Sequence, residues 1–116
     1  NVVTALIESW REFGEEPYVG VVRSHDAFYV ESPWAHKEWE ERIQKWVDAG
    51  VKLLENESSA LFIISQLLGM RAGSILLARG NLVEDTVIDF KEYFPKRVKL
   101  MTEIAIRALE KLDKLP

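Results

Sequence analysis

The sequence contains no cysteine among its 116 residues. This absence excludes disulfide bonds, a cysteine nucleophile and metal sites built on thiolate sulfur. Histidine is also scarce, because only His25 and His36 are present and they do not stand at the spacing of paired ligands. We therefore expect no metal site and no cofactor.

Glycine is sparse and dispersed. The six glycines stand at positions 14, 20, 50, 69, 73 and 80, and no two are closer than four residues. A loop that holds a phosphate group with backbone N–H groups needs clustered glycines at the start of a helix. The sequence is therefore not expected to contain a phosphate loop of this kind.

Positive charge and long apolar runs are lacking too. The net charge is −4 and no basic block occurs, so nucleic acid and an anionic membrane are not expected as partners. No apolar run approaches the roughly 18 residues that span a bilayer, and no signal-peptide pattern is seen. We expect a soluble, cytoplasmic protein.

The residues that are present alternate between strand-like and helix-like patterns. Apolar residues at helical spacing predict helices over 3–13, 36–49, 56–68 and from 95 onward. Short β-branched and apolar runs predict strands over 18–23, 51–55 and 73–79. The predicted helix over 56–68 is apolar on nearly every face and should be buried. This alternation predicts one layered α/β domain.

Two carboxylates stand one residue apart in the tract Glu55-Asn56-Glu57, which begins at the last residue of the predicted strand over 51–55. A carboxylate at the mouth of a sheet can accept two hydrogen bonds at once, which suits the vicinal hydroxyls of a ribose. A structural alternative is that Asn56 caps the following helix and Glu57 interacts favourably with its dipole.

Three segments occur in a recognisable order, over residues 20–29, 55–62 and 71–77. In that order and at that spacing they resemble the C-terminal half of the nucleoside phosphorylases, closest to the uridine phosphorylase branch. The resemblance implies a three-layer fold with a mixed central sheet flanked by helices. It also implies that residues 1–116 are the C-terminal portion of a single domain, whose N-terminal half carries the phosphate loop. These residues alone are then expected to be an incomplete enzyme.

The resemblance further implies a pentosyltransferase that cleaves a uridine-like nucleoside with phosphate as co-substrate, giving a base and ribose 1-phosphate. Glu57 matches the glutamate that binds the ribose hydroxyls, and Glu55 matches the supporting one. Asn56 replaces the methionine usual in the family, and its amide could still bind a ribose hydroxyl. Phe28 matches the aromatic residue that stacks on the base. Asn81 can hydrogen-bond a base but cannot act as a general acid.

The choice of base is left open by the sequence. Uridine phosphorylases carry a glutamine and an arginine shortly after the Phe28-Tyr29 pair, and residues 30–34 contain neither. Two alternatives therefore stand beside phosphorolysis: a nucleosidase that uses water, and a non-catalytic nucleoside-binding or interaction protein. His25 is not expected to pair with Asp26, because adjacent side chains in an extended segment point opposite ways.

Assembly is the last expectation. The apolar helix over 56–68 needs cover on more sides than one sheet supplies. Together with the resemblance, this pattern predicts a homo-oligomer, a hexamer or a dimer, in which the N-terminal half is also present.

Overall fold

The computed structural model describes residues 1–27 and 29–114. Phe28, the residue expected to stack on a base, lies outside the described residues. Within them the chain forms four α-helices and four strands. In chain order these are α1 (Val2–Glu12), β1 (Val21–Ser24), α2 (Trp39–Asp48), β2 (Val51–Glu55), α3 (Ser58–Leu67), β3 (Gly80–Asn81), β4 (Thr86–Val87) and α4 (Tyr93–Asp113).

The four predicted helices are formed, and local signals fix several of their ends. Asn1 caps α1, because its Oδ1 accepts a hydrogen bond from the backbone N–H of Thr4 at 2.9 Å. Gly14 and Gly50 follow α1 and α2 with φ of +81° each. A residue without a β-carbon adopts this left-handed conformation at little cost, so each glycine ends its helix.

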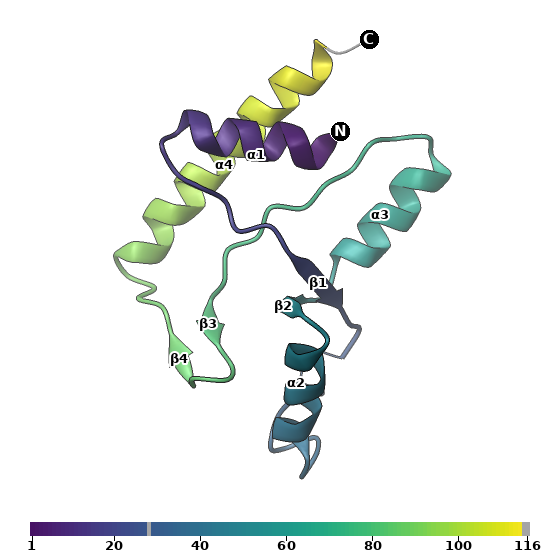
Figure 1. Cartoon of the computed structure of the whole chain (residues 1–116), viewed down its shortest axis with the longest axis vertical. Coiled ribbons are helices and arrows are strands. Elements are labelled where there is room, and N and C mark those ends of the chain that lie inside the picture. The colour runs from purple at the N-terminus through teal and green to yellow at the C-terminus, as the bar shows by residue number, and fades with distance from the viewer. Residues whose placement is uncertain (28, 115–116) are drawn as a thin grey trace.

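The strands β1 and β2 pair in parallel, with Val21 opposite Val51 and Ser24 opposite Glu55. The chain between them passes through α2, as a parallel pair requires a crossover connection. Because the strands run the same way, both carboxyl ends lie at one edge of the sheet (Figure 1). This edge brings the residues after Ser24 next to those after Glu55.

The predicted strand over 73–79 is not formed, although the one over 51–55 is confirmed. Residues 71–79 connect α3 to β3 without a ladder partner in the described parts of the chain. Gly73 instead lies so close to Val2 of α1 that an added β-carbon would overlap the valine side chain. The β1–β2 pair and the antiparallel β3–β4 hairpin remain two small sheets. The described structure is therefore mixed α/β, without a visible three-layer arrangement.

A small hydrophobic core forms where α1 crosses α4 (Figure 1). It contains Ala5, Ala108 and Leu112, and Val2 and Leu6 pack against it. Two ion pairs flank this contact: Glu12 lies 2.7 Å from Arg107 and 2.6 Å from Lys111. The hydrogen bonds from these cations hold the pKa of the Glu12 carboxyl below its usual value.

The prediction that the third helix is buried is wrong. Large apolar side chains of α3 and the residue after it are exposed, namely Leu61, Phe62, Ile63, Ile64, Leu67 and Leu68. Its buried residues are Ser58 and Ser65. Figure 1 shows α3 standing away from the α1–α4 pair, so the helix does not share their core. An apolar pattern indicates that a helix face tends to be buried, but it does not identify the element that packs against that face. No described helix is both long and apolar enough to cross a membrane.

Candidate functional site

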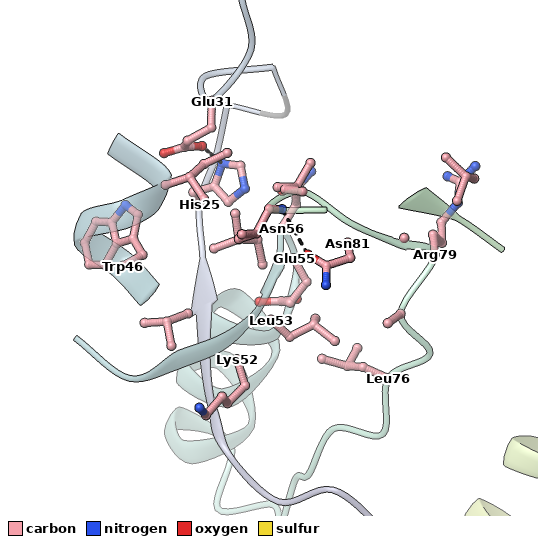
Figure 2. A pocket seen from close by; sticks show the side chains of 18 of the residues that line it. His25, Glu31, Trp46, Lys52, Leu53, Glu55, Asn56, Leu76, Arg79 and Asn81 are labelled. Atoms are coloured by element: carbon pink, nitrogen blue, oxygen red, sulfur yellow. Dashed lines mark hydrogen bonds and ion pairs between the residues drawn. The ribbon is translucent and has the colours of Figure 1, made fainter. Parts of the chain in front are cut away.

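A cavity of about 900 Å³ extends along β2 to its carboxyl end. This is within the size range of small-molecule sites. One wall comes from α2 and the residues that follow β1, and the facing wall comes from residues 76–83 and 85–87. Figure 2 shows Trp46 and Glu31 on one side of this space and Leu76 and Arg79 on the other.

Glu55 ends β2 and is held by hydrogen bonds on both oxygens. The Ser24 hydroxyl donates to Oε1, while the backbone N–H groups of Glu57 and Ser58 donate to Oε2 at 2.9 and 2.7 Å. Burial raises the pKa of the Glu55 carboxyl, but the hydrogen bonds from Ser24, Ser58 and Glu57 outweigh it and lower that pKa to about 2. Glu55 is therefore an ionised residue that fixes the strand end to the start of α3.

Glu57 precedes α3 and is exposed at the cavity wall. Its Oε2 accepts a hydrogen bond from the Asn56 backbone N–H at 3.3 Å. The carboxylate keeps further acceptor capacity, because each of its oxygens has two lone pairs. Of the two carboxylates in the tract, Glu57 is thus the one that is exposed at the cavity.

Asn56 joins the two strand ends. In the amide orientation that satisfies both neighbours, its side-chain nitrogen donates to the His25 and Glu55 carbonyl oxygens, each at 3.1 Å. The alternative in which Asn56 caps α3 is wrong, because Glu57 is at the N-cap position and the Glu55 carboxylate accepts from the first N–H groups. Asn56 therefore holds the cavity edge in place, because its side chain bonds to the backbone of both strand ends.

Asn81 lies in β3 and lines the same cavity. Its Oδ1 accepts hydrogen bonds from the backbone N–H groups of Val83 and Glu84, at 2.9 and 3.3 Å. This arrangement commits the amide oxygen to the local turn. The amide nitrogen is the part of Asn81 suited to contact a ligand.

Sequence reasoning missed a charged cluster at the end of β1. The Glu31 side chain is only 3% exposed, and its Oε1 lies 2.6 Å from Nη1 of Arg23. The Arg23 guanidinium is 4.3 Å from the ring centroid of Trp46. His25 Nδ1 lies 4.0 Å from Glu31 Oε2, and Figure 2 shows the imidazole beside this carboxylate. Glu31 stands in a stretch without periodic pattern, so its burial left no signal in the sequence.

Comparisons with known proteins place this geometry in context. The family model described as the phosphorylase superfamily matches residues 1–110. A guanosine phosphorylase of Halorubrum lacusprofundi is 33% identical over 109 residues, which cover 92% of this chain and 42% of the relative. A uridine phosphorylase of Haemophilus influenzae is 37% identical over 79 residues, covering 62% of this chain and 31% of the relative.

The similarity extends to further relatives, although each is much longer than this chain. A uridine phosphorylase of Escherichia coli is 28% identical over 116 residues, covering 91% of this chain and 46% of the relative. The chain thus spans less than half the length of these three relatives. No solved structure matches significantly. The family match over nearly all residues decides the matter: the chain belongs to the phosphorylase superfamily.

Proposed function

We propose that the protein is a nucleoside phosphorylase, which cleaves a nucleoside with phosphate into a base and ribose 1-phosphate. The observation that carries the proposal is the exposed Glu57 carboxylate at the carboxyl end of β2, on the wall of the 900 Å³ cavity. Relatives named guanosine phosphorylase and uridine phosphorylase support the reaction class. Within it, a uridine-like substrate is the more specific proposal.

The chemistry follows from the charge that develops on the sugar. Phosphate attacks C1′ while the bond to the base breaks, and the ribose acquires oxocarbenium character. A carboxylate that accepts hydrogen bonds from the 2′- and 3′-hydroxyls orients the ring and stabilises this positive charge. In this proposal Glu57 holds the ribose. Glu55 supports it by fixing the Glu57 and Ser58 backbone.

The remaining proposed contacts concern the base and the assembly. Asn81 offers its amide nitrogen to the base, Asn56 holds the edge of the site, and Phe28 is proposed to stack on the base. We further propose that the protein acts in the cytoplasm as a homo-oligomer. Phosphate is a co-substrate, and no cofactor takes part in the proposed reaction.

The test compares Glu57→Gln with Glu40→Gln, a matched change at an exposed position on α2. Uridine, guanosine and inosine are incubated with and without phosphate, and base and ribose 1-phosphate are measured. We expect phosphate-dependent cleavage by the wild type and by Glu40→Gln. Glu57→Gln should lose about 100-fold or more in kcat/KM, the scale for removing one group that stabilises transition-state charge.

A second candidate function rests on Asn56, which stands where the family usually has methionine. In that reading the protein binds a nucleoside without cleaving it. Calorimetric binding of uridine without turnover in either condition supports this reading. Base release that is independent of phosphate instead identifies a nucleosidase.

A further inference from the structure

The Glu31 carboxylate, which pairs with Arg23 of β1, has no role in the proposed reaction as described so far. It is almost fully buried, and Arg23 occupies only its Oε1. Its Oε2 is also buried and accepts no hydrogen bond from the described residues. A buried charged oxygen without a hydrogen bond is costly, so its retention needs a reason.

The nearest candidate partner of that oxygen is His25. Its Nδ1 lies 4.0 Å from Glu31 Oε2 and 2.9 Å from the backbone oxygen of Ala27. Both neighbours are acceptors, so Nδ1 carries a proton and donates to Ala27. Nε2 is then the nitrogen that remains to contact a ligand in the cavity that His25 lines.

His25 also lines the cavity that is proposed to hold the base. It follows the last residue of β1, and its backbone N–H donates to the Glu55 carbonyl oxygen at 3.0 Å. Its side chain lines the cavity that Glu57 also lines, together with the aromatic rings of Trp46 and Phe90. A ribose held by Glu57 places its base in this same cavity, among flat apolar surfaces. The other charged residues lining the cavity are Glu31, Lys52, Glu55, Arg79 and Asp85.

We propose that His25 is a catalytic residue that donates a proton to the departing base, and that Glu31 is its positioning residue. The inference rests on the proposed phosphorolysis. As the C1′–N bond breaks, its electron pair stays on the base nitrogen, which takes the proton from Nε2. An oxygen of hydrogen phosphate forms the new bond to C1′. The imidazole then recovers a proton from the remaining phosphate hydroxyl, so the proton passes overall from phosphate to base.

The experiment compares two leaving groups in the full protein. A nucleoside base needs a proton as it departs, whereas nitrophenolate departs from a nitrophenyl riboside without one. We expect His25→Ala to lower kcat for the nucleoside by about 100-fold, the usual scale for general acid catalysis, and to leave the nitrophenyl riboside nearly unaffected. Added imidazole should restore part of the lost nucleoside activity. His36→Ala is the matched control, because this histidine does not line the cavity.

Glu31→Gln tests the positioning role. We expect a lower kcat for the nucleoside, an unchanged KM, and normal turnover of the nitrophenyl riboside. Equal losses with both substrates, or an effect of Glu31→Gln on KM alone, would overturn the assignment. Full nucleoside activity of His25→Ala overturns this inference while leaving the proposed function intact. Absence of phosphate-dependent cleavage by the wild type refutes the proposed function itself, and this inference with it.

Discussion

Glu55 illustrates how a single side chain joins two elements at the site. Its carboxylate receives a hydroxyl hydrogen bond from β1 and backbone hydrogen bonds from the start of α3. These bonds favour the ionised form, because a protonated carboxyl accepts fewer of them. The local structure of the proposed ribose-binding edge therefore depends on the charge of a residue that is not itself presented to the ligand.

This charge predicts an acid-sensitive stability. The pKa of Glu55 is about 2 in the folded protein against an ordinary value of 4.5. Because the folded pKa is the lower one, the stabilisation is fully present above about pH 4.5 and is lost as the pH falls towards 2. Glu55→Gln should remove this component, which we expect to be about 1–2 kcal/mol given the partial exposure of the group.

Urea unfolding measured from neutral pH down through this window checks the prediction. The free energy of unfolding of the wild type should fall more steeply with acid than that of Glu55→Gln. Glu40→Gln serves as the control and should follow the wild type. Parallel curves for wild type and Glu55→Gln would show that the hydrogen bonds to Glu55 add nothing to stability.

At the scale of elements, the features predicted correctly from the sequence are those that depend on residues close together in the chain. Asn1, Gly14 and Gly50 act within a few residues of themselves, and the helices they bound are present. The sequence also predicted that the tract from Glu55 to Glu57 lies at a strand end, because an apolar run directly precedes Glu55.

The errors concern long-range contacts. A strand over 73–79 needs a neighbouring ladder, and burial of α3 needs a covering element, neither of which is encoded in the segment itself. The cluster of Arg23, His25 and Glu31 escaped prediction for the same reason. It forms only because the chain after β1 turns back towards that strand. The role of Phe28 stays a prediction, since it lies outside the described residues.

The α1–α4 pair is expected to carry much of the stability. Ile104 is 0% exposed, whereas Ile106, two residues along the same helix, is 53% exposed. Ile104→Ala removes buried methylene and methyl groups and leaves a cavity, which should cost about 3 kcal/mol of unfolding free energy. Ile106→Ala is the matched control and should cost well under 1 kcal/mol. Chemical denaturation measures both, and similar losses would show that the buried Ile104 side chain adds no more stability than the exposed Ile106 side chain.

For the whole molecule, the radius of gyration and the exposed apolar surface both favour association with another chain. The radius of gyration is 16.1 Å, whereas a compact domain of this length has roughly 13 Å. The exposed apolar surface includes Leu67 at 81% and Ile63 at 61%. A contiguous exposed apolar helix face is unusual for a monomer and favours association.

We therefore expect the 116-residue chain to associate in a concentration-dependent way. Sedimentation velocity should show species larger than the monomer, and Ile63→Glu should shift the distribution towards the monomer. Leu109→Glu, a matched change at a 65% exposed leucine of α4, should have little effect. A compact monomer that melts cooperatively at all concentrations would contradict this expectation.

The crossing of α1 and α4 has a consequence for biosynthesis. The core residue Ala5 is made near the beginning of this segment, while Ala108 and Leu112, its core partners, are made near its end. At about 5–20 residues per second, the ribosome needs roughly 5–20 s to make the intervening ~100 residues. During that interval α1 lacks the part of its core that α4 supplies. The core between α1 and α4 is therefore completed only after α4 emerges from the ribosome.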